Sequence, residues 1–260
     1  MNSLSIAVAV AALVASSGLI GLILQRVLPE SYTSDRSRDM IGGVVGLTTL
    51  LLALVLGLLI WTAYGVTTLQ QNGLQTIAAR SLEFDLEMRH YGREADPARS
   101  LLRRDLDWAL EQFWGDGTAN ADAYEASYKV MGDMNVFFDS LDPKQPAQQN
   151  LLSAARANYG FIGEQRLLMS LQATTPVSWP LIYTVTAWSC MLFFGMGLLS
   201  RLGVLPLIMM LAGAAAISSA IFLILEFNRP YTGAFRVSPE PLEQAIVQLG
   251  LPSASTDAKK

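Results

Sequence analysis

Four stretches of this chain are each long enough and apolar enough to cross a lipid bilayer. None of them contains a charged side chain, and they run over Leu4–Leu24, Met40–Gly65, Val177–Leu199 and Leu205–Leu225. A transmembrane helix needs about 20 mostly apolar residues, and a buried helix of a water-soluble domain rarely extends that far without a Lys, Arg or Glu. The sequence therefore predicts an integral membrane protein in contact with the lipid bilayer.

The composition supports helices rather than a barrel. The chain has 260 residues, of which only 15% are charged, against about 25% in average soluble proteins. The alternating ten-residue segments of an outer-membrane barrel are absent, and backbone groups in lipid must bond within their own segment. We therefore predict an all-α, polytopic fold with four transmembrane helices. The net charge of −4 argues against nucleic acid as a partner.

The spans form two pairs around a polar middle region. A polar segment, Gln25–Asp39, joins the first pair, and only Arg201-Leu202-Gly203 joins the second. We expect transmembrane helices over 1–65, a helical extramembrane domain over 66–178, a transmembrane hairpin over 179–226, and a C-terminal turn and tail over 227–260. The first span lacks the positive start of a signal peptide and exceeds its usual apolar length, so we expect an uncleaved anchor.

The middle region has the pattern of helices throughout and is predicted to contain no sheet. Asp96-Pro97 is typical of an N-cap followed by proline at the first helical position, and Gly115-Asp116-Gly117 is expected to end that helix. Further helices are predicted over Ala121–Leu141 and Ala147–Leu171. We expect these helices to be continuous in part with the second and third spans.

Residues suited to catalysis or metal binding are scarce. His90 is the only histidine and Cys190 the only cysteine, so no transition-metal ligand set can be assembled by spacing. Phosphate-binding and nucleophile-elbow motifs are also absent. We expect no enzymatic activity, no catalytic or metal site and no cofactor.

The second span carries one face of small residues. These recur at helical spacing and are Gly42, Gly46, Thr49, Ala53 and Gly57. Small residues let helix backbones approach closely in lipid. Two interpretations stay open: the face packs within the subunit, or it meets a neighbouring subunit. The first span has a similar stripe, which consists of Ala11, Ala15, Gly18 and Gly21.

The ends of the spans carry aromatic residues and a turn. Trp61, Tyr64 and Trp179 occupy positions typical of an interfacial belt. After the fourth span, a predicted turn contains Asn228, Arg229, Pro230 and Gly233. No span contains a charge, which disfavours an ion-coupled transporter but is compatible with a passive pore.

Three segments together resemble the bestrophin-like domain family of bacterial membrane proteins. They are Arg36-Ser37-Arg38-Asp39 leading into Gly42–Leu59, then His90–Arg103, and finally Glu226–Leu242. The resemblance implies a multi-pass protein of the bacterial inner membrane. True bestrophins are pentameric anion channels, so it further implies a homo-oligomer, a pentamer if the chain is bestrophin-like, that conducts inorganic anions such as chloride. The chain departs from them at Trp61-Thr62-Ala63-Tyr64, where bestrophins have an Arg-Trp-Trp run, and it has no acidic calcium clasp.

These observations lead to two functional hypotheses. The first is an oligomeric bestrophin-like ion (anion) channel, whose apolar neck lies along the second span. Its predicted pore-lining residues are Leu50, Leu51, Leu54, Leu58 and Trp61. The alternative is a membrane-anchored helical interaction or sensor module that does not conduct.

The orientation in the membrane depends on which of two arguments is followed. Four spans place both termini and the middle region on the same side. Four arginines lie near the membrane on each side: Arg80, Arg166, Arg229 and Arg236 on that side, against Arg26, Arg36, Arg38 and Arg201 in the short loops. Positive charge in short loops favours cytoplasmic loops, whereas the bestrophin layout implies the reverse. We expect the termini and the middle region to be cytoplasmic.

Overall fold

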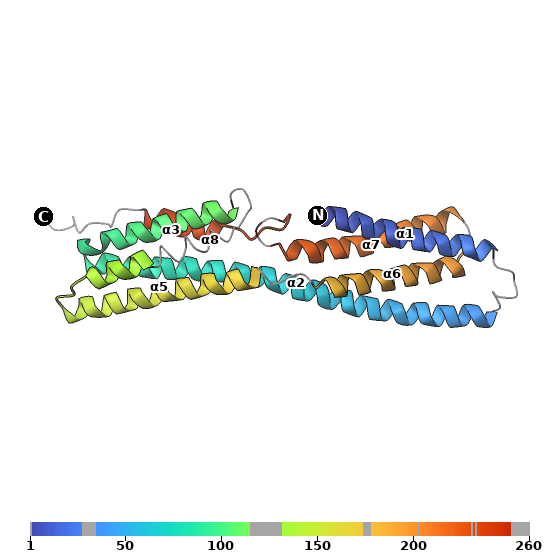
Figure 1. Ribbon diagram of the computed structural model, residues 1–260, viewed down its shortest axis with the longest axis horizontal. Coiled ribbons are helices and arrows are strands. Elements are labelled where there is room, and N and C mark those ends of the chain that lie inside the picture. Colours follow the sequence, from blue (N-terminus) through green and yellow to red (C-terminus); the bar gives the residue numbers. More distant parts are fainter. Residues whose placement is uncertain are drawn as a thin grey trace. The chain divides into compact units, whose positions relative to one another are not determined.

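The computed structural model describes residues 2–27, 35–114, 132–173, 178–201, 203–229, 231 and 233–250. Every regular element in this part of the chain is helical (Figure 1). The elements are α1 (Ser3–Val27), α2 (Asp35–Tyr91), the 3-10 turn η2 (Arg93–Ala95), α3 (Asp96–Trp114), a helix over 132–140, α5 (Pro146–Ala173), α6 (Trp179–Leu199), α7 (Val204–Phe227) and α8 (Glu240–Leu249).

Four of these helices, α1, α2, α6 and α7, are long and apolar enough to cross a membrane. The predicted all-α fold with four transmembrane helices is therefore confirmed. By its internal packing the chain divides into two compact units. We call residues 1–66 with 176–228 the span unit, and residues 67–175 with 229–260 the middle unit.

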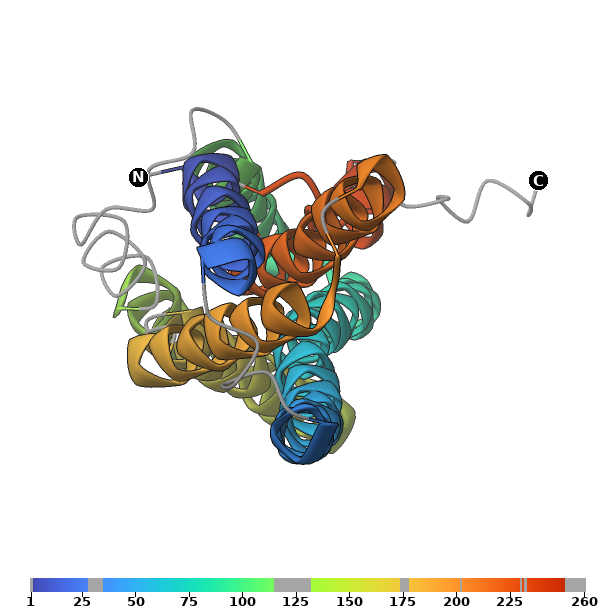
Figure 2. The same ribbon diagram turned by 90° about the vertical axis from the view of Figure 1, so that its right-hand side faces the viewer.

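In the span unit, α1 packs against both helices of the α6–α7 hairpin (Figures 1 and 2). The Ser17 hydroxyl donates to the Cys190 carbonyl at 2.7 Å, and the Ser218 hydroxyl donates to the Ala7 carbonyl at 2.6 Å. Together with the approach of Gly21 to Phe194 and of Gly18 to Met210, these pairs show that α1 is parallel to α6 and antiparallel to α7. A methyl group added to Gly21 would collide with the Phe194 carbonyl, so glycine is what permits this close approach.

The middle unit has its own core, built from the second half of α2, from α3, the helix over 132–140, α5 and α8. Its centre contains three aromatic rings, Phe84, Phe138 and Tyr159, whose centroids lie 6.0–6.1 Å apart. Around them the largest fully buried aliphatic side chains are those of Met88, Leu102, Leu106, Met134 and Ile162. The core explains why this unit needs no lipid to bury its apolar side chains.

The second span continues into the middle unit without a break. α2 has 57 residues and is therefore about 85 Å long. The predicted continuity is thus confirmed for the second span, but it is wrong for the third. There α5 ends at Ala173, and Ser178 has a non-helical backbone as the N-cap of α6. Pro180 lies in the first turn of α6, where its missing N–H costs nothing.

Three local predictions need correction or fall outside the described residues. Asp96 is the first residue of α3 and already helical, because η2 leads directly into the helix; its carboxylate therefore pairs with Arg99 rather than acting as an N-cap. The predicted tail contains helix α8, which begins with Glu240-Pro241. Of the predicted helix Ala121–Leu141, residues 132–140 are helical, while 121–131 and the turn at 115–117 lie outside the described part of the chain.

Candidate pore-lining face and post-span turn

Of the four candidate spans, α2 is by far the least covered by its own chain. Only 6% of its most apolar 18-residue window is buried, against 33% in α1, 39% in α6 and 28% in α7. An apolar helix in such a position must be covered by lipid or by another protein chain. This open surface is the part of the span unit best placed to form an interface or a pore.

The surface of α2 within the span unit has three faces. One face packs against the apolar core of the unit through Val45, Leu52, Leu56 and Leu59, and Ala63 on the same side of α2 is buried. The second carries the predicted pore-lining residues and the third carries the small residues. With about 100° between successive residues of an α-helix, the centres of these faces lie roughly 90° to 160° apart.

The predicted pore-lining residues share one exposed face of α2. The exposed fractions are 72% for Leu50, 42% for Leu51, 72% for Leu54, 61% for Leu58 and 72% for Trp61. Leu50, Leu54 and Trp61 are thus the most exposed of the five side chains. We call this the Leu/Trp face; whether it lines a pore stays a prediction.

The glycines of the small face of α2 also have no close neighbour within the described part of the chain. A methyl group added to Gly42, Gly46 or Gly57 would lie more than 4 Å from any other atom. Thr49 and Ala53 are exposed, and the Thr49 hydroxyl donates to the Val45 carbonyl of its own helix at 2.8 Å. Packing within the subunit therefore receives no support from the described residues, and contact with a neighbouring subunit stays a prediction.

Close packing within the chain occurs instead at the stripe on α1. Gly18 and Gly21 are buried, and a methyl group on Gly18 would collide with the Met210 side chain. Gly197 of α6 approaches the Gly18 carbonyl in the same way. The two glycine-rich spans thus differ: the stripe on α1 is used inside the subunit, and the one on α2 is open.

From Arg229 onward, the segment that follows α7 belongs to the middle unit. Asn228 ends the last span, and its side-chain amide donates to the Ile224 carbonyl at 2.7 Å. The Gly233 N–H then donates to the Arg229 carbonyl at 3.1 Å, which closes the predicted turn. Pro230, also predicted to lie in this turn, is outside the described residues.

Gln70 is the anchor for this segment. It is fully buried on α2, its carbonyl accepts from the Tyr231 hydroxyl at 2.5 Å, and its amide donates to the Met169 carbonyl of α5 at 3.0 Å. The Trp114 indole packs edge-on against Tyr231 and donates to the Val237 carbonyl at 2.8 Å. Sequence reasoning missed Gln70 and Tyr231, since nothing in their local sequence links positions 161 residues apart.

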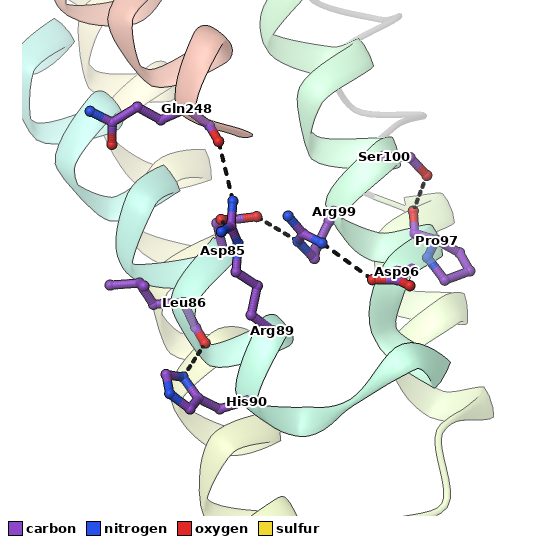
Figure 3. Close-up of polar contacts among 9 residues, drawn as sticks. All are labelled: Asp85, Leu86, Arg89, His90, Asp96, Pro97, Arg99, Ser100 and Gln248. Atoms are coloured by element: carbon purple, nitrogen blue, oxygen red, sulfur yellow. Dashed lines mark hydrogen bonds and ion pairs between the residues drawn. The ribbon is translucent and has the colours of Figure 1, made fainter. Parts of the chain in front are cut away.

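The turn between α2 and α3 is fixed by ion pairs around Asp85. Figure 3 shows this carboxylate between two guanidinium groups, with Arg89 and Arg99 each at 2.6 Å. Arg89 also donates to the Gln248 carbonyl in the last turn of α8 at 3.2 Å, where a cation is favoured by the helix dipole. Gly92 has φ 128°, which only glycine adopts easily.

This turn lies within His90–Arg103, one of the three segments singled out in the sequence. The Nδ1–H group of its single histidine, His90, donates to the Leu86 carbonyl of the same helix at 2.7 Å. Arg99 makes its second contact with Asp96 at 3.2 Å. The segment therefore positions α3 and α8 on α2.

A second polar pair lies deeper in the middle unit. The Asp105 side chain is fully buried and accepts from Arg166 at 2.6 Å. Burial raises the pKa of the nearby Tyr159 phenol, and the Asp105 carboxylate raises it further. Burial likewise raises the pKa of Glu87, although the Asn158 amide donates to its carboxylate at 2.9 Å. These groups link α2, α3 and α5, and no set of three metal-ligating side chains occurs among the described residues.

Comparison with protein families identifies the chain. The model of the bestrophin-like domain matches residues 10–242. The chain belongs to the bestrophin-like family. The match includes α1 from Val10 onward, the whole of α2, α6 and α7, and the turn around Asp85. No curated protein and no solved structure matches the chain. The family match therefore shows a bestrophin-like membrane protein, and its activity is a matter for proposal.

Proposed function

We propose that this bestrophin-like protein is a homo-oligomeric, non-enzymatic membrane pore that conducts inorganic anions such as chloride passively. The observation that supports this proposal best is the open surface of α2, on which only 6% of the apolar window is covered. In a ring of subunits, a pore-lining helix contacts its own subunit, a neighbour and the pore. The three faces of α2 meet these three requirements.

In this arrangement the Leu/Trp face forms an apolar neck. Leu50, Leu54 and Leu58 follow one another at single-turn spacing, so copies from several subunits would stack as rings of methyl groups. A neck of this kind opens and closes to ions by wetting and dewetting. The small face would contact the next subunit, because small residues permit close helix approach without a hydrophobic driving force.

The assembly would be a pentamer if it follows the bestrophins that the sequence resembles. We place it in the bacterial inner membrane, with both termini and the middle unit in the cytoplasm.

Reconstitution into liposomes tests the proposal. We expect the purified protein to carry chloride, measured separately from potassium flux, and Leu54→Ala to increase the leak because it widens the neck. Leu13→Ala on α1, where Leu13 is 56% exposed, is the matched control and should leave the flux unchanged. Absence of flux in the wild type and in alanine variants at all five Leu/Trp-face positions would contradict the proposal.

The middle unit favours a second candidate function. It has its own core and an internal ion-pair network, which also suits a membrane-anchored interaction or sensor module that does not conduct. The purified oligomer size separates the two functions, since a pore requires a ring. A monomer that is fully folded in several detergents and lipids would favour the sensor module.

A further inference from the structure

The Leu/Trp face of α2 offers almost no hydrogen-bond donors to a permeating ion. Between Met40 and Gly65 every threonine hydroxyl of α2 is already used, and Tyr64 lies toward the small face and packs edge-on against Phe227. Thr48 donates to Val44, Thr49 to Val45 and Thr62 to Leu59, all within the helix and at 2.8–3.0 Å. These side chains therefore present oxygen lone pairs rather than O–H groups.

Trp61 is the exception. Its side chain is 72% exposed, and its indole N–H makes no hydrogen bond among the described residues. It lies one turn beyond Leu58 and two turns beyond Leu54 on the same face. An indole nitrogen can only donate, so the neck ends at a group that can interact with anions but has no lone pair for a cation.

We propose that the indole N–H groups of Trp61 contact the permeating anion at the end of the apolar neck and set the preference for anions over cations. The inference rests on the proposed pore. Each subunit contributes one neutral donor, so the ring binds a monovalent anion without the strong attraction that a ring of arginines would exert. Weak binding of this kind lets the ion leave again, as conduction requires.

Two other roles for Trp61 make different predictions. As a member of an interfacial belt it would face lipid headgroups, and removing its N–H would leave ion selectivity unchanged. If its ring face bound cations, phenylalanine would preserve the effect because it keeps an aromatic face. Substitutions that separate the N–H from the ring therefore decide between the three roles.

The test measures the anion-to-cation permeability ratio from reversal potentials in planar bilayers. Trp61→Phe removes the donor and keeps a ring, and Trp61→His at pH 8 keeps an N–H on a neutral ring, since histidine titrates near 6.5. Trp179→Phe is the matched control, because Trp179 is a partly exposed tryptophan at the start of α6. Size-exclusion chromatography checks that each variant keeps the wild-type assembly.

We expect Trp61→Phe to lower the ratio about tenfold, since a hydrogen bond to a charged group contributes at least that factor. Trp61→His should restore most of the ratio, and Trp179→Phe should not change it. An unchanged ratio in Trp61→Phe, equal loss in Trp61→His, or an equal fall in Trp179→Phe would each overturn the role of Trp61 while the pore stands. A wild-type protein that never conducts would overturn the pore and this inference together.

Discussion

At the scale of single residues, the glycines of the spans fall into two kinds that a paired substitution separates. Gly21 of α1 faces the Phe194 carbonyl, whereas Gly43 of α2 has no atom within 4 Å of the position of an added methyl group. We expect Gly21→Ala to destabilise the protein by about 1–3 kcal/mol, because backbone must move to accept the methyl group. Gly43→Ala should be neutral or stabilising by up to about 1 kcal/mol, since alanine favours helix.

Thermal unfolding in detergent measures this difference directly. The Gly21→Ala midpoint should fall by several degrees while the Gly43→Ala midpoint stays or rises. Equal midpoints for the two variants would mean that α1 and α6 do not approach as closely as the Gly21–Phe194 contact requires.

The ion pairs of the middle unit give a second prediction at this scale. Asp85 has a side chain that is only 5% exposed and contacts two arginines, whereas Asp96 is 57% exposed. Asp85→Asn leaves Arg99, which is 12% exposed, without its buried counter-charge, and we expect a loss of about 3 kcal/mol. Asp96→Asn should cost less than about 1 kcal/mol, as is usual for exposed pairs.

Chemical denaturation of the purified protein, followed by tryptophan fluorescence, compares these two variants. Both substitutions remove one negative charge, so net charge cannot explain a difference. A similar loss in both would show that burial of Asp85 does not determine the strength of the cluster.

At the scale of helices, the small face of α2 predicts at which positions a substitution should disrupt the oligomer. A methyl group added at Gly46 or Gly57 has no atom of another described part of the chain within 4 Å, so with leucine there the folded subunit should keep its stability. In an assembly it would push neighbouring backbones apart, and we expect loss of the native oligomer. Gly43→Leu is the control, because at about 100° per residue Gly43 lies on the Leu/Trp face rather than on the small face, and an added methyl group there also has no atom within 4 Å.

Light scattering coupled to size-exclusion chromatography gives the mass of each variant. We expect a smaller assembly for Gly46→Leu and Gly57→Leu and the wild-type mass for Gly43→Leu. If all three elute as the wild type, the small face contacts lipid.

The helices also show what sequence patterns can and cannot predict. The four spans were predictable because a long charge-free stretch leaves a single way to satisfy its backbone in lipid. Helix α8 was missed, although Leu242, Ala245, Ile246 and Leu249 are spaced as a buried helical face, since the preceding prolines and glycine favoured a turn. The Gln70–Tyr231 contact could not be predicted, because it depends on how distant helices pack.

At the scale of the whole molecule, the proposed orientation can be tested by labelling. The proposal places the tail in the cytoplasm and the turn between α6 and α7 outside. In a Cys190→Ala background, Gly203→Cys should react with a membrane-impermeant maleimide in intact cells, and Ser253→Cys should react only after lysis. Gly203 is exposed with an extended backbone, so cysteine fits there.

The opposite pattern would follow if positive charge in short loops determined the orientation. Arg26, Arg36, Arg38 and Arg201 all lie near the end of the span unit where α1 and α6 end and α2 and α7 begin. Labelling of Ser253→Cys but not Gly203→Cys in intact cells would therefore place that end in the cytoplasm.

The packing of α1 against α6 has a consequence for how the protein is made. Ser17 and its partner Cys190 are 173 residues apart, an interval that a ribosome translates in roughly 10–35 s. Over that time the glycine stripe of the newly inserted α1 has no helix to cover it, and we expect lipid to occupy the position of α6. The same glycines that allow close contact in the finished protein thus leave the nascent chain exposed to membrane quality control until its last two helices emerge.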